Sequence, residues 1–310
     1  MALPRKRPPP ARGRTSLTRF TRFLAVDWSG AKGARQKGIA LALARAEGGP
    51  PVLLAPPDPK GWARSEVLVL LQSLSEPTLV GLDLGISLPF ADAGAFFPDW
   101  EASPADARAL WALIDGLCAE DPHLEAGGFL AHQQASRYFR HGKGAEGDRF
   151  LLPGAATREG RFRIAEHAQR AAGVRPVSNF NLVGAAQVGK SSLTGMRMLH
   201  RLERKVPVWP VDPLPGEGSV ITEIYTAMAA RLGGVTGTAT KIRTYEALSD
   251  ALSQLDSPPV TGHGAIDDHS SDALLTAAWL RRVHATRELW HPPALTPAIA
   301  RTEGWTFGAL

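Results

Sequence analysis

Cysteine is almost absent from this chain of 310 residues, which contains only Cys118. A single cysteine excludes an intramolecular disulfide framework and any zinc site built from several cysteines. No apolar stretch approaches the roughly 20 residues needed to span a bilayer, and no apolar signal segment follows the basic N-terminus. These absences predict a cytoplasmic protein that does not enter a membrane.

Acidic side chains are missing from the first 22 residues, which carry seven Arg or Lys. The remaining 288 residues hold 28 Lys and Arg against 30 Asp and Glu, so the tail accounts for the net charge of +5. A Pro- and Arg-rich segment cannot bury a core, and we expect residues 1–19 to form a disordered basic tail. Such a tail either contacts nucleic-acid phosphates or only keeps the protein in solution.

Short apolar runs bounded by turn residues predict strands, and apolar residues at helical spacing predict helices. The expected strands cover residues 23–27, 38–46, 52–55, 78–83 and 220–225. The expected helices cover residues 62–74, 104–120, 191–205, 241–255 and 267–284, and the second has Ser103 as its cap and Pro104 at its first position. Residues 141–160 are rich in glycine and charge and predict a loop.

This element order predicts an α/β fold. The first three strands form an antiparallel meander, and the later alternation of helices and strands implies parallel crossovers. We therefore expect a mixed sheet flanked by helices, in one domain over residues 20–290. A long helical insertion would occupy about residues 91–215, and residues 291–310 would be a C-terminal extension.

Acidic residues stand at the ends of two predicted strands, Asp27 and Asp83, and at the start of the last long helix, Asp268 and Asp272. Strand ends are natural places for a site in an open α/β sheet, and residues four apart share a helix face. Carboxylates brought together repel one another unless cations neutralise them, and Mg²⁺ or Mn²⁺ prefers such oxygen ligands. The alternative is that each acid only caps a turn or a helix.

Four short motifs carry a resemblance to a known family. They are Val26–Lys32 (VDWSGAK), Gly81–Pro89 (GLDLGISLP), Val220–Tyr225 (VITEIY) and Asp268–Leu274 (DHSSDAL). In their order and spacing they resemble the predicted RNase H-like nucleases grouped as domain of unknown function 429. The resemblance implies an RNase H-like fold with site acids on the first strand, the fourth strand and the last helix. These would be Asp27, Asp83 and Asp272, with Glu223 matching a glutamate that the family keeps on its fifth strand and Asp268 as a further member.

A second motif competes with the carboxylates. Gly184–Ser191 (GAAQVGKS) fits the phosphate-binding pattern G-x-x-x-x-G-K-[ST], with a possible strand at 179–183 before it and a predicted helix after it. A partner strand carrying the magnesium-binding acid is missing, because Val206–Asp212 contains two prolines. The motif therefore indicates either a nucleotide-binding loop or a helix start that binds a substrate phosphate.

The middle of the chain is rich in arginine, with phenylalanines between the charges, which is typical either of a nucleic-acid surface or of a solvated insertion. His269 lies among the acids and is predicted to be a surface histidine. The alternative is that it orients a ligand or water.

The leading hypothesis is a metal-dependent nuclease that uses Asp27, Asp83 and Asp272, assisted by Asp268 or Glu223, on a nucleic-acid partner. The alternatives are a nucleotide-binding protein that uses Gly184–Ser191 and an RNase H-like module that binds without catalysis.

Overall fold

The computed structural model of the chain describes residues 20–155, 157–184, 187–235 and 241–310, and the predicted basic tail at 1–19 lies outside them. Within these ranges the strands are β1 (Arg22–Asp27), β2 (Ala40–Arg45), β3 (Val52–Leu54), β4 (Thr78–Asp83), β5 (Arg140–Gly142), β6 (Ala145–Glu146), β7 (Val208–Trp209) and β8 (Val220–Glu223). The α-helices are α1 (Arg64–Gln72), α2 (Ala107–Leu117), α3 (Gly127–Ala131), α4 (Ile164–Ala171), α5 (Val188–Arg201), α6 (Thr226–Leu232), α7 (Tyr245–Gln254), α8 (Asp268–Val283), α9 (Arg287–Trp290) and α10 (Pro297–Thr302).

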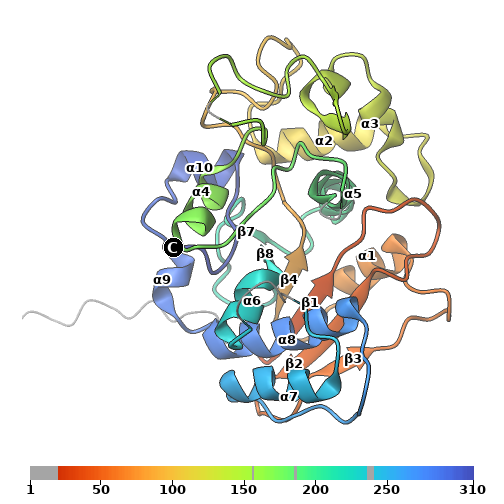
Figure 1. The fold of residues 1–310 in the computed structure, drawn as a ribbon, viewed down its shortest axis with the longest axis vertical. Coiled ribbons are helices and arrows are strands. Elements are labelled where there is room, and N and C mark those ends of the chain that lie inside the picture. Colours follow the sequence, from red (N-terminus) through yellow and green to blue (C-terminus); the bar gives the residue numbers. More distant parts are fainter. Residues whose placement is uncertain (1–19, 156, 185–186, 236–240) are drawn as a thin grey trace, which may run out of the picture.

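The central sheet has the strand order β3-β2-β1-β4-β8-β7. β1, β2 and β3 pair in antiparallel fashion, whereas β1, β4, β8 and β7 are parallel neighbours. Helices flank this sheet on both faces (Figure 1). The arrangement confirms the predicted α/β fold with its three-strand meander and parallel strands.

Alternate residues of the strands face two different cores. Phe23 and Ala25 of β1 pack in the core that contains the apolar residues of α8. Leu24 and Val26 belong to the core on the opposite face, which contains the apolar residues of α2 and α5. In Figure 1, α7 and α8 lie at the bottom of the view and α2, α3 and α5 at the top. This period of two fixes which face each strand-end side chain can reach.

Helix α8 lies close against the sheet because both surfaces carry small residues. It packs on β1 and β2, where alanines of the helix meet alanines of the strands. At Gly81 of β4, an added Cβ would lie 2.8 Å from Ile224 and 3.0 Å from Leu280, so only glycine fits there. Asp267 caps the helix by accepting a hydrogen bond from the Ser270 N–H at 2.9 Å. Close packing and a defined start together fix where the first turns of α8 stand relative to β1.

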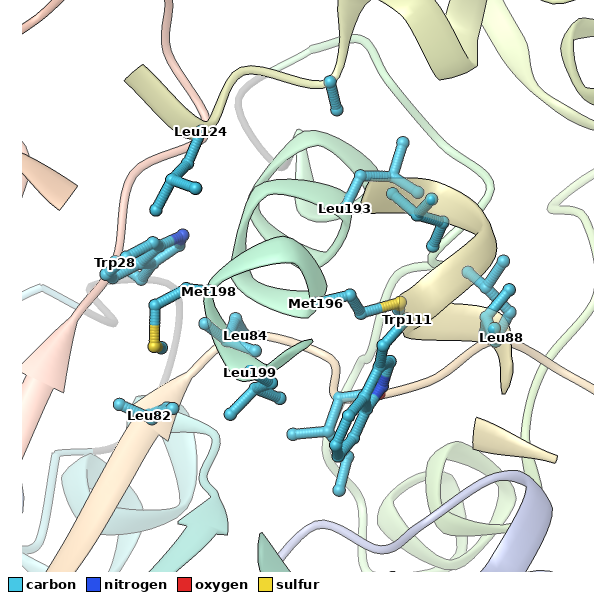
Figure 2. Packing of buried hydrophobic residues seen from close by; sticks show 14 of the residues in the cluster. Trp28, Leu82, Leu84, Leu88, Trp111, Leu124, Leu193, Met196, Met198 and Leu199 are labelled. Atoms are coloured by element: carbon cyan, nitrogen blue, oxygen red, sulfur yellow. The ribbon is translucent and has the colours of Figure 1, made fainter. Parts of the chain in front are cut away.

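Helix α5 lies within the segment predicted as an insertion, yet it covers the other face of the sheet. Its side chains Leu193, Met196 and Met198 are fully buried. Figure 2 shows Trp28 and Met198 on one side of α5, with Met196 and Trp111 on the other. The segment therefore supplies a layer of the domain rather than a separate appendage.

The last 20 residues, which the sequence analysis separates as an extension, also belong to the core. Trp305 and Phe307 are fully buried among the aromatic residues near α9. Phe307 N–H donates to the backbone carbonyl of Glu223, which continues the pairing at the end of β8. The Glu303 carboxylate accepts hydrogen bonds from backbone N–H groups of Phe90 and Ile164.

Several element boundaries differ from those predicted. Helix α2 begins three residues later than expected, with Asp106 as its cap, because the Asp106 carboxylate accepts from the Ala109 N–H. The expected strand at 179–183 is reduced to one bridge, between Asn181 and Arg140. The expected loop at 141–160 contains the β5–β6 hairpin. β7 forms despite its flanking prolines because it is a two-residue edge strand.

Among the described residues, none of the helices combines the length and apolar character that crossing a bilayer requires.

Candidate functional site

Asp27 and Asp83 stand side by side at the carboxyl ends of adjacent strands. Each is the last residue of its strand, β1 or β4, and the two are partners in the parallel register. Neighbouring strands lie about 4.8 Å apart, and register partners point to the same face. The sheet therefore places both carboxylates together on the face covered by α8.

Asp272 comes to this pair from the second turn of α8, which packs against β1. Burial, followed by repulsion from Asp27, raises the pKa of Asp272 from its usual 3.8 to about 7. Burial and repulsion from Asp27 and Asp272 also raise the pKa of Asp83 well above its usual range. Asp27, only 7% exposed, has a pKa raised by burial. The three acids form one cluster whose full ionisation is unfavourable without a cation.

His269 lies at the surface as predicted, with its side chain 48% exposed, and it also contacts the cluster. Its Nδ1 lies 2.9 Å from Asp27 Oδ2, so the ring is fixed on the strand end. The hydrogen bond to Asp27 raises the pKa of His269. His269 stands three residues before Asp272, a spacing that puts both side chains on neighbouring positions of α8. That spacing was visible in the sequence, but nothing local distinguished it from the four-residue spacing of Asp268.

Asp268, predicted as a further member of the cluster, is engaged in ion pairs, and its charge also contributes to raising the pKa of Asp272. Its Oδ2 lies 2.6 Å from Lys241 Nζ and 3.6 Å from Arg243, in the segment before α7. The hydrogen bond to Lys241 lowers the pKa of Asp268. On helix α8, His269 and Asp268 stand three and four residues before Asp272, so their side chains project on opposite sides of the Asp272 side chain. The side that faces Asp27 carries His269. Asp268 is therefore an ion-pair residue.

Glu223 ends β8, but it lies on the other face of the sheet from Asp83. The register pairs Glu223 with Leu82, and a shift of one residue reverses the face. Its carboxylate accepts from both terminal nitrogens of Arg163, from the Ile86 N–H at 2.8 Å and from the Thr306 hydroxyl. Arg163 is itself fully buried. These bonds give Glu223 a structural role, while its charge contributes to raising the pKa of Asp83 and it lines the same cavity as that acid.

A cavity of about 390 Å³ opens beside the cluster, at the carboxyl ends of β1, β4 and β8. Asp83 and His269 line one side of it, and the first turn of α5 with Lys190 and Ser191 lines another. The two sides are close because the loop after β1 touches α5. At Gly30, an added Cβ would lie 2.4 Å from the Lys190 carbonyl carbon and 2.4 Å from the Ser191 nitrogen. The carboxylate cluster and the phosphate-loop motif thus border one cavity.

The surroundings of that motif differ from those of a nucleotide-binding loop. Ala185 and Ala186 lie outside the described residues, but residues 179–184 directly before them contribute no strand to the six-stranded sheet. Lys190 Nζ bonds to the Gln187 side chain at 2.9 Å. What the structure retains of the motif is a helix start with a lysine in its first turn.

The arginine-rich middle segment does not offer a row of unpaired charges. Its arginines form ion pairs with carboxylates: Arg137 with Asp148, Arg140 and Arg158 with Glu146, Arg149 with Asp99, Arg161 with Asp92, Arg163 with Glu166 and Glu223, and Arg170 with Glu159. The phenylalanines between them, Phe139, Phe150 and Phe162, are buried in the fold. This segment therefore packs as part of the domain, and its charges are largely compensated.

The donor chemistry of the cluster suits a hydrated divalent ion. Within the described ranges, no three His, Cys, Asp or Glu side chains are grouped so that they could enclose a metal ion. Mg²⁺ does not need such a cage, because it is usually held by one or two carboxylates, with water and substrate phosphate as the other ligands. Adjacent carboxylates with raised pKa values would suit the role of those one or two ligands.

No protein-family model, curated protein or solved structure matches this chain. The strand order β3-β2-β1-β4-β8-β7, antiparallel at one end and parallel at the other, is consistent with an RNase H-like fold.

Proposed function

We propose that this protein is a metal-dependent nuclease that hydrolyses phosphodiester bonds at the Asp27, Asp83 and Asp272 cluster. The carrying observation is the in-register placement of Asp27 and Asp83 on adjacent strand ends, with Asp272 brought to them by α8. The resemblance of the surrounding motifs to RNase H-like nucleases of domain of unknown function 429 supports the same reading, as does the strand order.

One or two of Asp27, Asp83 and Asp272 would hold Mg²⁺ or Mn²⁺, with water and substrate phosphate as the other ligands. Bound there, the ion would supply Lewis-acid activation of water and stabilisation of the leaving oxygen. Asp27 also orients His269, because its carboxylate lies 2.9 Å from Nδ1 of the ring. The Thr226 hydroxyl, 3.5 Å from Asp83 Oδ2, is a weak further contact.

The test is hydrolysis of single-stranded and duplex DNA and RNA with Mn²⁺. We expect Asp27→Asn and Asp83→Asn each to lower the rate more than about 100-fold, since even partners of metal ligands matter 10- to 100-fold. Asp268→Asn is the matched control, because this acid lies on the same helix as Asp272 but pairs with Lys241. Equal rates for wild type and Asp27→Asn would show that the cleavage does not come from this site.

The same experiment separates the alternatives. Binding of nucleic acid without hydrolysis, unchanged in Asp27→Asn, would favour a module that binds without catalysis. Hydrolysis of ATP lost in Lys190→Ala would favour the nucleotide-binding motif, although residues 179–184 before α5 do not form the strand of the central sheet that this motif requires.

A further inference from the structure

The cavity beside the carboxylates has features that the hydrolysis of a phosphodiester does not use. Its volume of about 390 Å³ falls in the range of small-molecule sites. Most of its surface is apolar, and Trp28 and Tyr225 contribute aromatic rings. The Trp28 indole N–H already bonds to Thr194 Oγ1 at 3.0 Å, and the Tyr225 hydroxyl bonds to the Arg175 carbonyl at 3.3 Å. Both rings are therefore held in place and offer apolar surface.

One polar side chain in this wall has no partner. Gln169 of α4 lines the cavity and is only 3% exposed. Its side-chain amide forms no hydrogen bond with another described residue, and it is not one of the fully enclosed polar atoms without a partner. The amide is therefore open to a ligand in the cavity. A primary amide offers one acceptor and two donors side by side, a pattern that complements the edge of a nucleobase.

The start of α5 provides a positively charged environment at the same cavity, in contrast to the neutral amide of Gln169. This helix has no acidic residue in its first turn, and Gln187 provides no side-chain cap. Its first turn carries Lys190, a cation at the positive end of the helix dipole, where an anion would be favoured. Lys190 and Ser191 line the cavity, as Gln169 does. A phosphate is the anion that helix starts commonly bind through backbone N–H groups.

We propose that this cavity holds a single nucleotide of the substrate strand. Its phosphate would lie at the first turn of α5, and its base between the aromatic walls and Gln169. An anion without a base would leave the aromatic walls and Gln169 without partners. An apolar acid would also leave the Gln169 amide unsatisfied. The Gly30 contact keeps the phosphate end next to the loop after Asp27, which places this nucleotide beside the acids. The inference rests on the proposed nuclease function for the identity of the strand, but binding by the cavity can be tested without catalysis.

The test measures binding of AMP, GMP, CMP and UMP, of the corresponding nucleosides, and of inorganic phosphate, by calorimetry in EDTA. We expect at least one monophosphate to bind about tenfold more tightly than its nucleoside, as a charged hydrogen bond supplies. Lys190→Ala should remove most of that difference, because it removes the ammonium group that would contact the phosphate, together with its bond to the Gln187 side chain. Gln169→Leu should weaken the monophosphate and its nucleoside alike.

Lys205→Ala is the matched control, an exposed lysine just beyond the other end of α5. It should bind as the wild type does. If Gln169→Leu does not fold, the comparison of Lys190→Ala with Lys205→Ala decides, since Lys190 is not buried. Absence of monophosphate binding at millimolar concentration, or equal affinities in wild type and Lys190→Ala, would overturn the inference.

The two proposals fail separately. Monophosphate binding that depends on Lys190, without any hydrolysis of nucleic acid, would leave the nucleotide site standing and remove the nuclease. Hydrolysis that depends on Asp27, with no binding of monophosphates and no effect of Lys190→Ala on KM, would do the reverse.

Discussion

Removing the Asp272 charge should stabilise this protein in the absence of metal ions. Burial and repulsion from Asp27 raise the pKa of Asp272 from 3.8 to about 7. Such a rise corresponds to about 4 kcal/mol by which folding disfavours the ionised form. The variant Asp272→Asn keeps the shape of the side chain and removes the charge. In EDTA at pH 8 we therefore expect it to be more stable than the wild type by up to about 4 kcal/mol.

The pH dependence has a definite sign. Because the carboxyl has a higher pKa in the folded state, the unfolded chain loses its proton first as the pH rises. The penalty is small below pH 3.8, grows between 3.8 and about 7, and is complete above that pH. The advantage of Asp272→Asn should therefore shrink to below about 1 kcal/mol at pH 4. Urea unfolding followed by tryptophan fluorescence at both pH values measures the difference.

The control for this prediction lies one turn earlier on the same helix. Asp268→Asn makes the same chemical change, but Lys241 holds the pKa of Asp268 below its usual range. This variant should not gain stability at pH 8. Saturating Mn²⁺ should stabilise the wild type, by about 2.7 kcal/mol at 100 times the dissociation constant, and Asp272→Asn less. The reasoning is refuted if Asp272→Asn is no more stable than the wild type at pH 8 in EDTA.

Three further predictions concern the frame of the site. Gly30→Ala should destabilise the fold by about 1–3 kcal/mol, because its Cβ would overlap the first turn of α5, whereas Gly116→Ala, with open space around its Cβ, should be stabilising or neutral in thermal unfolding. Glu223→Gln should lower the free energy of unfolding by about 3–5 kcal/mol, because it leaves the buried Arg163 guanidinium with only part of its ion pairing. If Mn²⁺ still stabilises this variant, Glu223 is not a metal ligand. Ending the chain after Trp290 should abolish cooperative urea unfolding, because Trp305 and Phe307 leave the core, and an unchanged transition would show that residues 291–310 are dispensable.

Much of the fold could be predicted because its signals are local. The apolar runs ending at Asp27 and Asp83 are strands, and the amphipathic segment from Asp268 is a helix capped by Asp267. A period of two, or of 3.6, is a property of neighbouring residues and needs no knowledge of distant ones. The mixed sheet followed from the order of these elements.

The register of the strands and the rotation of α8 about its axis could not be predicted from local sequence patterns. Glu223 and Asp83 both end strands, and only the pairing of Glu223 with Leu82 shows that they face opposite sides. Asp268 and His269 are adjacent in sequence, and only the docking of α8 on β1 turns His269 toward Asp27 and Asp268 toward Lys241. A displacement of one residue reverses such an assignment, and composition does not change with it.

The sequence by itself determined five strands of the central sheet (β1, β2, β3, β4 and β8), five helices (α1, α2, α5, α7 and α8), the mixed α/β sheet and the acids that end its first and fourth strands. Tertiary structure decided which side chains meet: Asp27 with Asp83 and His269, Glu223 with Arg163, and the start of α5 with the loop at Gly30. The reason is that secondary structure follows from short-range periodicity, whereas a site depends on contacts between residues 56 to 242 positions apart, as in Asp27–Asp83 and Asp27–His269.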